Sequence, residues 1–369
     1  MAPYWAELVG NPSSPHAAGA TAQHAVERGR TFVAQLIGAT SSEITFTSGA
    51  TEANNIAIQG IAKAALRHGV RRRQIIVAPI EHKSVLAAAQ SLKESGFATA
   101  VTPVNRDGSI EVEGLRAMLS DDTLLVSVGL ANGEIGTVQP IGDIAREVRK
   151  AGALLHSDLA QAVGRVPIDV QSMDIDLASL SAHKVHGPAG IGALFVSAVA
   201  ALRPEPLFFG GAQEAGMRPG TTPVPLAVGF GSAAELAIDH LEHDALHTAA
   251  LVQAFLTALT ALRVSYGLNG SRVSRIPGSL SLQLRGVDGR SIVERVSTKL
   301  SISTGSACQA GGLDTSHVLQ SINIPRDEQV ATVRICFGRY NSMSDAATAA
   351  QIIAEAVNSE KLATGDVVQ

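Results

Sequence analysis

The fold is decided by residues 153–196, which read ALLHSDLAQAVGRVPIDVQSMDIDLASLSAHKVHGPAGIGALFV. Three short apolar runs lie in this stretch, at 153–156, 177–181 and 192–196. Apolar runs of this length are typical of strands that are buried on both faces of a sheet. Asp158 closes the first run, and Lys184 follows the second. The stretch therefore predicts buried strands with ionisable side chains just where two of them end.

The same alternation of apolar runs and helical periods extends through the first two thirds of the chain. Apolar residues in 22–37 recur at i, i+3 and i+4, which is the period of an amphipathic helix. Further strands are predicted at 44–47, 75–79, 98–103 and 124–130, and further helices at 51–67, 84–95, 112–119 and 141–151. Strands that alternate with helices indicate an α/β fold with a mainly parallel sheet covered by helices.

The pattern changes after about residue 226. A long helical period covers 227–262, and apolar runs at 278–284 and 330–337 are mixed with helical periods at 291–299 and from 345 onward. This mixture is typical of a smaller α+β domain. We predict a large domain over residues 12–240 and a small domain over residues 241–369, to which residues 1–11 also belong.

Composition excludes several classes of protein. The 369 residues are 46% hydrophobic and 17% charged, a balance that supports a core and argues against disorder. A net charge of −4 argues against a protein that coats nucleic acid. Two cysteines cannot make a disulfide framework, and the 11 histidines show no zinc-binding spacing, so no metal site is expected. No apolar run reaches the length of a membrane span and no signal-peptide pattern is present, so we expect a cytoplasmic protein.

Lys184 and Asp158 point to one kind of chemistry. A lysine at the mouth of a parallel sheet lies where ligands bind in such folds, and it can form a Schiff base with an aldehyde cofactor. Pyridoxal phosphate needs a carboxylate beside its ring nitrogen, which Asp158 can supply, while Gln161 can reach the phenolic oxygen. The residues alone leave open a surface lysine and a helix N-cap.

Two upstream segments suit the same cofactor. Small residues in the segment 47–55, TSGATEANN, join a strand to a helix, and backbone N–H groups at such a start suit a phosphate. His82 follows the strand at 75–79 and can stack on a planar ring. The alternatives are a simple helix cap for the segment and a buried, satisfied histidine for His82.

The two cysteines have different surroundings. Cys308 lies in STGSACQAGG, residues 303–312, a polar stretch with glycines that is typical of a loop, where a thiolate can act as a nucleophile. Cys336 lies inside the apolar run 333–337 and is predicted to be a small core residue. Arg334 stands two residues earlier and needs an anionic partner, which can be a structural carboxylate or that of a substrate.

Together these residues resemble the cysteine desulfurases of the NifS/IscS type, which are fold-type I pyridoxal-phosphate enzymes of the class V aminotransferase group. The resemblance extends from Gly10 to about Tyr340. Its motifs in this chain are GNPSS at 10–14, TSGATE at 47–52, EHK at 81–83, EIGT at 134–137, HSD at 156–158, GGAQE at 210–214, RPGT at 218–221, STGSAC at 303–308 and RICFGR at 334–339.

The resemblance implies a role for each matching residue. Lys184 would bind the cofactor covalently, Asp158 would hold its ring nitrogen, and Gln161 its phenolic oxygen. His82 would stack on the ring and move protons. The phosphate would be bound by Ala50, Thr51, Ser181 and His183, and by Thr221 across a homodimer. Arg334 would anchor the carboxylate of L-cysteine, and Cys308 would take its sulfur as a persulfide, releasing alanine.

Two features depart from the family pattern. The usual N-terminal strand of the type LDNAATT would stand about twenty residues before the NPSS segment at 11–14, and in this chain Met1 stands ten residues before Asn11. The family also has two consecutive asparagines where this chain has Asn132 and Gly133, so substrate contact falls to Asn132 or to water. Two alternatives stay open. A sibling class V aminotransferase or lyase would share Lys184, Asp158 and His82 and would not need Cys308, while the two departures favour a cofactor-binding but catalytically weak partner protein.

The resemblance also implies partners. A homodimer and a sulfur-acceptor protein are expected, with no membrane and no direct nucleic-acid binding. The acceptor is left open by the sequence, because iron–sulfur assembly, tRNA thiolation and DNA phosphorothioation all use such enzymes.

Lys184 gives the first test. Borohydride reduction should fix the cofactor on Lys184 and remove the yellow colour, whereas Lys184→Ala should fix none, because it lacks the amine that forms the Schiff base. Peptide mapping of the reduced protein identifies the modified residue. A modified peptide that contains a different lysine would show that this assignment is wrong.

Overall fold

The structure is a computed structural model that describes residues 1–305 and 316–364. The chain divides into two compact units. Unit 1 comprises residues Met1–Pro103, Ile110–Leu130 and Gln139–Leu241, and unit 2 comprises Val104–Ser109, Ala131–Val138 and Glu242–Gln369. Each unit is described by itself below.

The N-terminal residues 1–11, which we expected in the small domain, belong instead to unit 1. Gly10 lies so close to α2 (Ala17–Gln35) that a Cβ atom on it would stand 2.4 Å from the carbonyl oxygen of Ala18. The Met1 side chain packs over Gly229 in the same way. Two short segments of the expected large domain, 104–109 and 131–138, belong to unit 2, where Thr137 bridges Arg275.

Unit 1 is built on a seven-stranded sheet with the order β1-β7-β6-β5-β4-β2-β3. Its strands are β1 (Ile44–Thr47), β2 (Gln74–Val77), β3 (Ala98–Val101), β4 (Thr123–Ser127), β5 (Leu154–Asp158), β6 (Leu177–Ser181) and β7 (Gly192–Val196). The strands from β3 through β2, β4 and β5 to β6 pair in parallel, and β7 is antiparallel to β6 and β1. The prediction of a mainly parallel sheet is therefore confirmed.

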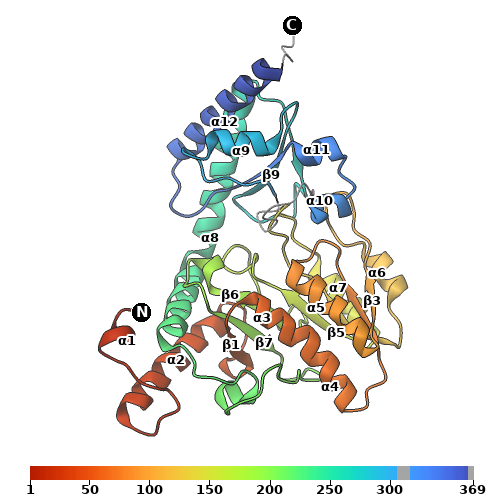
Figure 1. The fold of residues 1–369 in the computed structure, drawn as a ribbon, viewed down its shortest axis with the longest axis vertical. Coiled ribbons are helices and arrows are strands. Elements are labelled where there is room, and N and C mark those ends of the chain that lie inside the picture. The colour runs from red at the N-terminus through yellow and green to blue at the C-terminus, as the bar shows by residue number, and fades with distance from the viewer. Residues whose placement is uncertain (306–315, 365–369) are drawn as a thin grey trace. The chain divides into compact units, whose positions relative to one another are not determined.

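Helices cover this sheet (Figure 1). They are α2, α3 (Ala50–Asn55), α4 (Ile61–Arg67), α5 (Lys83–Ser91), α6 (Val112–Met118) and α7 (Ile141–Lys150). The short helix α1 (Pro3–Ala6) buries none of its residues. A π-helical turn, Ile56–Gly60, joins α3 to α4, so the helix predicted over 51–67 is nearly continuous. Apolar residues of α3–α5 form one core with the sheet, in which Ile56, Ile61 and Val85 contact the cluster of Ile75, Leu125 and Leu194.

Unit 2 contains a three-stranded antiparallel sheet with the order β10-β9-β8. Its elements are β8 (Tyr266–Asn269), β9 (Ser279–Leu284), α9 (Gly289–Val296), α10 (His317–Ser321), α11 (Arg326–Val330), β10 (Thr332–Cys336) and α12 (Met343–Thr364). The long helix α8 (Val224–Ala261) begins in unit 1 and ends in unit 2. A core that includes Phe255, Leu280 and Ile353 fills the second unit, as expected for an α+β domain.

Cys336 is exposed, so its assignment to the core is wrong. Side chains alternate along β10, where Val333 and Ile335 are buried at 0% and 4% exposure. Cys336 lies on the opposite face at the end of the strand, with its sulfur 3.8 Å from Ser279 Oγ.

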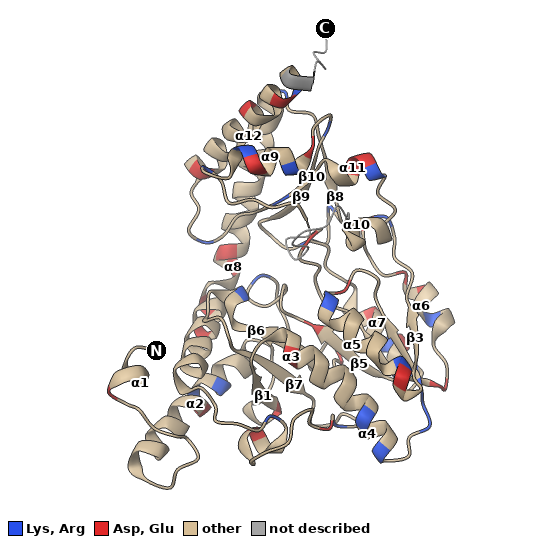
Figure 2. Ribbon diagram, viewed as in Figure 1, with Lys and Arg blue, Asp and Glu red and all other residues tan. Residues whose placement is uncertain are grey.

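Charge is nearly absent from the large sheet. Among the seven strands of unit 1, Asp158 is the single Asp, Glu, Lys or Arg, and the other charged residues lie on helices and loops (Figure 2). His156, two residues before Asp158 and therefore on the same face of β5, is fully buried. Its Nδ1 lies 2.8 Å from Ser127 Oγ and its Nε2 lies 3.0 Å from Ser179 Oγ. Burial lowers the pKa of His156 to about 3, so the imidazole is neutral in the folded protein.

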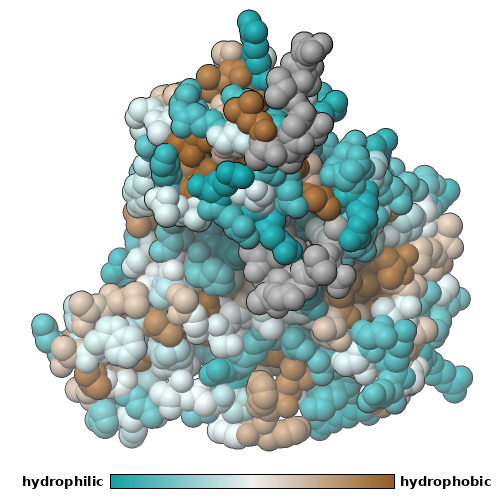
Figure 3. Space-filling model, turned by 45° about the horizontal axis from the view of Figure 1, so that its top comes forward, coloured by the Kyte–Doolittle hydropathy of each residue, from teal (hydrophilic) through white to brown (hydrophobic). Residues whose placement is uncertain are grey.

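The surface is mixed in character. On the face shown in Figure 3, hydrophobic residues form separate patches between polar ones. Within residues 1–305 and 316–364, no helix combines the length and the hydropathy that a membrane span requires.

The buried imidazole predicts acid sensitivity. Below about pH 6.5 His156 binds a proton in the unfolded chain but not in the folded protein. The free energy of unfolding should therefore fall by about 1.4 kcal/mol per pH unit toward pH 3. His156→Gln should remove this dependence, and its stability relative to the wild type should rise by about 2–3 kcal/mol between pH 6.5 and 4.5. Urea denaturation at both pH values measures the difference. The exposed His24→Gln is the control, and an unchanged slope in His156→Gln would contradict the assignment.

Candidate active site

The segment predicted to bind phosphate forms the turn between β1 and α3. Gly192 on β7 lies against Gly49, since a Cβ atom on Gly192 would stand 2.6 Å from the Gly49 Cα. This close approach brings the start of α3 beside the end of β6, where Ser181 lies. Ala50 and Thr51 occupy the first turn of the helix, and Thr51 is exposed.

Ser181, His183 and Lys184 follow one another at the end of β6. A 3₁₀ turn, Ala182–Val185, carries the lysine. His183 Nδ1 lies 2.9 Å from Ser181 Oγ. Lys184 is half-buried, and burial together with the charge of Lys184 lowers the pKa of His183. The turn therefore presents a hydroxyl, an imidazole and an amine at one strand end.

Asp158 ends the neighbouring strand β5 and is 8% exposed. Its Oδ2 accepts a hydrogen bond from Asn54 Nδ2 at 2.8 Å, and its Oδ1 accepts one from the Ala160 N–H at 2.9 Å. Both oxygens are thus held in place by neutral donors. Gln161 lies three residues further on, and its Oε1 is buried without a partner among the described residues. An orphaned oxygen of this kind fits a ligand that brings a hydroxyl donor.

His82 is the N-cap of α5 and is exposed. Its Nδ1 accepts from the Ser84 N–H at 3.2 Å and lies 2.7 Å from Ser84 Oγ. Ser84 Oγ in turn accepts a hydrogen bond from Asn54 Nδ2 at 2.9 Å. Because the Asn54 amide donates to Ser84, the serine hydroxyl is free to donate to His82 Nδ1. This assigns the imidazole proton to Nε2.

A polar chain therefore links two predicted site residues, from Asp158 through Asn54 and Ser84 to His82. Asn54 is fully buried and Ser84 is 9% exposed. Sequence reasoning missed both residues. The signal for Asn54 was that it is a polar residue on the buried side of the helix, where its neighbours are apolar. Ser84 gave no signal beyond its place two residues after His82.

Glu81 is a second buried carboxyl that sequence reasoning did not single out. It is 5% exposed, and its Oε1 accepts a hydrogen bond from the Gly129 N–H at 2.7 Å. Burial raises the pKa of Glu81 to about 8, and the charge of Asp158 adds to the effect against the opposing Gly129 hydrogen bond. Near neutral pH the Glu81 carboxyl is therefore largely protonated.

Unit 2 holds Arg334 and Asn132. The backbone of Arg334 pairs with Ser303, with N···O distances of 2.6 and 3.3 Å, and its Nε is buried without a partner among the described residues. Glu134 is 9% exposed; burial raises the pKa of its carboxyl, while a hydrogen bond from Ser316 and the charge of Arg334 lower it. Asn132 Oδ1 accepts from the Glu134 and Ile135 N–H groups at 2.8 and 3.0 Å, so this oxygen holds a turn.

Cys308, the predicted nucleophile, lies outside the described residues. The described residues on either side of its segment both meet Glu134. A Cβ atom on Gly305 would lie 2.2 Å from Glu134 Oε1, and Ser316 donates to the carboxyl. Within residues 1–305 and 316–364, no cluster of histidine, cysteine and carboxylate residues could hold a metal ion.

Comparison with known proteins gives a consistent result. The family model described as aminotransferase class-V matches residues 1–348. The chain is 42% identical over 359 residues to a cysteine desulfurase IscS of Rickettsia bellii, an alignment that covers 97% of this chain and 87% of that protein. Its fold is similar to a solved NifS-like protein (TM-score 0.89, 33% identity, 97% and 94% coverage) and to SspA in complex with cysteine (TM-score 0.79, 34% identity, 92% and 94% coverage).

The buried Glu81 predicts a pH-dependent effect of mutation. The unfolded chain loses the Glu81 proton near pH 4.5 and the folded chain near pH 8, so this group destabilises the fold increasingly as pH rises between these values. Glu81→Gln should therefore gain stability relative to the wild type, by about 1.4 kcal/mol per pH unit in that window. Thermal unfolding at pH 5 and pH 8 tests this, with the exposed Glu113→Gln as the control. An equal effect at both pH values would contradict it.

Proposed function

This chain belongs to the class-V aminotransferase family, and from that premise we propose that it is a cysteine desulfurase that uses pyridoxal 5′-phosphate. It converts L-cysteine to L-alanine and holds the sulfur as a persulfide on Cys308 for an acceptor protein. One observation carries the proposal. The Asp158 carboxylate, held by hydrogen bonds from Asn54 and Ala160, ends β5, and Lys184 follows the neighbouring strand β6.

The residues of unit 1 fit this cofactor. Lys184 would bind its aldehyde carbon, Asp158 its ring nitrogen, and Gln161, with an orphaned Oε1, its phenolic hydroxyl. The phosphate would lie between the start of α3, with Ala50 and Thr51, and the Ser181–His183 pair. When bound, pyridoxal phosphate supplies an electron sink for bonds broken at the substrate Cα.

The protein residues divide the work of this chemistry. The Asp158 carboxylate would hold a proton on the ring nitrogen, and the Asn54 and Ala160 donors orient that carboxylate. Lys184 Nζ would hold the aldehyde carbon of the cofactor and, as a free amine, would serve as the base for the substrate Cα proton. His82 offers an Nε2–H to the ring side, because its Nδ1 is occupied by Ser84.

In unit 2, Arg334 would anchor the substrate carboxylate. Its buried Nε, without a partner in the described part of the chain, suits an incoming anion. The Cys308 thiolate attacks the substrate sulfur, the S–S bond forms and the Cβ–S bond breaks. The electron pair left on carbon takes up a proton, so cysteine and an enzyme thiol yield alanine and an enzyme persulfide.

We propose a homodimer in which Thr221 reaches the phosphate of the partner subunit. Thr221 is exposed, and on the same unit Phe208 and Phe209 are 60% and 84% exposed. Phe208 lines a hollow of about 820 Å³ together with residues of α3, α4 and Arg218, and the centre of the Phe209 ring lies 4.8 Å from Nζ of Lys63, which also lines it. Exposed aromatic residues beside a hollow favour a second copy of the chain as its occupant. A reducing cytoplasm is the compartment that suits a persulfide carrier.

The division between the two cysteines is testable. Cys308→Ser should still bind the cofactor and change its spectrum with cysteine, but alanine release should fall on the order of 10³-fold, because the sulfur has no acceptor. Cys336→Ser should keep activity and, because Cys336 is exposed, change stability by less than about 0.5 kcal/mol. Alanine assay and persulfide mapping distinguish the two variants. Full alanine release by Cys308→Ser would favour a sibling class V enzyme, and a label on Cys336 would identify another nucleophile.

A further inference from the structure

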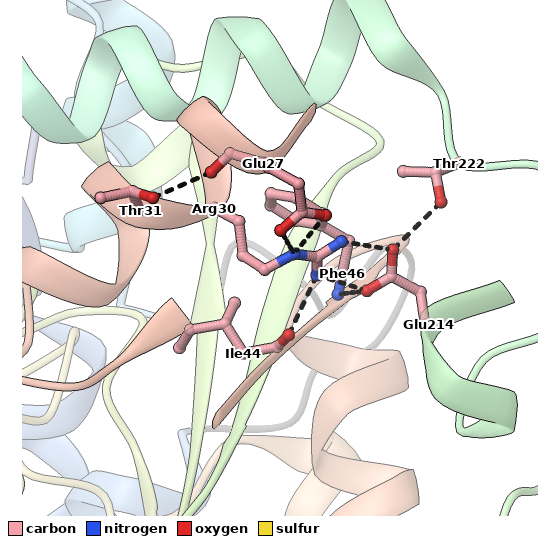
Figure 4. A network of polar contacts seen from close by, with 7 residues as sticks. All are labelled: Glu27, Arg30, Thr31, Ile44, Phe46, Glu214 and Thr222. Carbon is pink, nitrogen blue, oxygen red and sulfur yellow. Dashed lines mark hydrogen bonds and ion pairs between the residues drawn. The ribbon is translucent and has the colours of Figure 1, made fainter. Parts of the chain in front are cut away.

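A buried ion pair connects α2 to the segment that carries Thr221. Figure 4 shows Arg30 and Glu214 facing each other as two forks, with Arg30 Nη1 and Nη2 at 2.6 and 2.9 Å from the two carboxylate oxygens. Arg30 Nη1 also donates to the Ile44 carbonyl, and Nε donates to Glu27. The guanidinium carbon lies 4.7 Å from the ring centre of Phe46, whose N–H donates to Glu214.

Glu214 is held in an unfavourable backbone conformation. Its φ is +50°, and that of the following Ala215 is +53°, both in the left-handed region that residues with a Cβ atom rarely adopt. Gly216 continues the run at +79°. Two strained non-glycine residues in succession persist only where surrounding contacts over-determine them, and the four donors on the Glu214 carboxylate do this.

The segment from 213 to 222 closes on itself around these contacts. Gln213 Oε1 accepts from the Gly220 N–H at 3.1 Å, and Glu214 Oε1 accepts from Thr222 Oγ1 at 3.0 Å. Thr221 stands between these two tethered residues and is exposed, whereas Thr222 is 8% exposed. The backbone of Thr221 is thus fixed on both sides while its side chain faces outward.

We propose that the Arg30–Glu214 pair and Thr222 are positioning residues that hold Thr221 ready for the cofactor phosphate of the partner subunit. This rests on the proposed cofactor and homodimer. None of these three side chains needs to touch the cofactor, because each acts through the backbone at 220–222. Their effect on cofactor binding is therefore expected in the partner's site and not in their own.

Two variants remove the contacts that Glu214 makes with Thr222 or with Arg30. Thr222→Val keeps the shape of the side chain and the ion pair but removes the hydrogen bond to Glu214. Arg30→Met combined with Glu214→Met replaces the buried pair by apolar side chains, a change that folds are known to tolerate. Thr31→Val is the matched control, since exposed Thr31 donates to the Glu27 carbonyl and does not contact Glu214.

Hydrogen exchange measures directly how firmly the contacts of Glu214 hold the backbone of residues 213–222. In both variants the amides of residues 213–222 should exchange about tenfold faster than in the wild-type holoenzyme, while those of β5 and β6 should not change. Thr31→Val should match the wild type. Unchanged exchange at 213–222 would overturn the inference whatever the oligomeric state of the protein.

Mixed dimers test the direction of the effect. Two differently tagged chains are co-expressed and purified on both tags, with Lys184→Ala in one chain so that borohydride can fix cofactor only in the other. When Thr222→Val is on the Lys184→Ala chain, half-maximal fixing should need about tenfold more cofactor, equivalent to ~1.4 kcal/mol. When Thr222→Val is on the chain that retains Lys184, fixing should match the wild type.

Each outcome has a distinct meaning. Equal cofactor dependence in the two arrangements would overturn action across the interface. Failure to recover any chain on both tags would instead contradict the proposed homodimer. Cofactor fixed in neither arrangement nor in the wild type would contradict the proposed cofactor.

Discussion

The Asp158 carboxylate is the constraint on which the rest of unit 1 depends. It is the one charged side chain in seven strands, and a buried carboxylate is costly unless donors surround it. The Asn54 amide supplies one donor from α3 and continues through Ser84 to the first turn of α5. The same contacts that hold this carboxylate in the sheet therefore also fix the last turn of α3 and the first turn of α5 against it, which places Asp158 and His82 relative to one another.

Sequence periodicity predicted most of the fold because the strands of the sheet are buried on both faces. Continuous apolar runs marked β4 to β7, and the switch of pattern near residue 226 marked a second unit. Segments 1–11, 104–109 and 131–138 were placed in the wrong unit, since backbone packing at Gly10 and the bridge from Thr137 to Arg275 join residues far apart in the chain. Cys336 was wrongly assigned to the core because residues 333–337 were taken as one apolar run. In β10 successive side chains lie on opposite faces, so Val333 and Ile335 are buried and Cys336 is exposed.

The residues proposed to carry the chemistry could be named from motifs, but the residues that hold them in place could not. Lys184, Asp158 and His82 are recognisable by type and order in the class-V family. Asn54, Ser84 and Glu81 act only through contacts of their side chains, and Glu214 through a left-handed backbone that composition does not reveal. Asn132 was named from its motif, but its side-chain oxygen accepts hydrogen bonds from two backbone N–H groups of a turn. The motif alone did not indicate this structural role.

The cap at His82 has a consequence for ligand selectivity. A side chain that both begins a helix and faces solvent has one nitrogen committed to the protein and one left for a ligand. Since Nδ1 accepts from the Ser84 N–H, the ring can only donate outward, through Nε2. Inhibitors that present a carbonyl or sulfonyl oxygen to His82 Nε2 should therefore bind better than matched compounds that present an N–H. The cause of this preference is the contact between His82 and Ser84 in the first turn of α5.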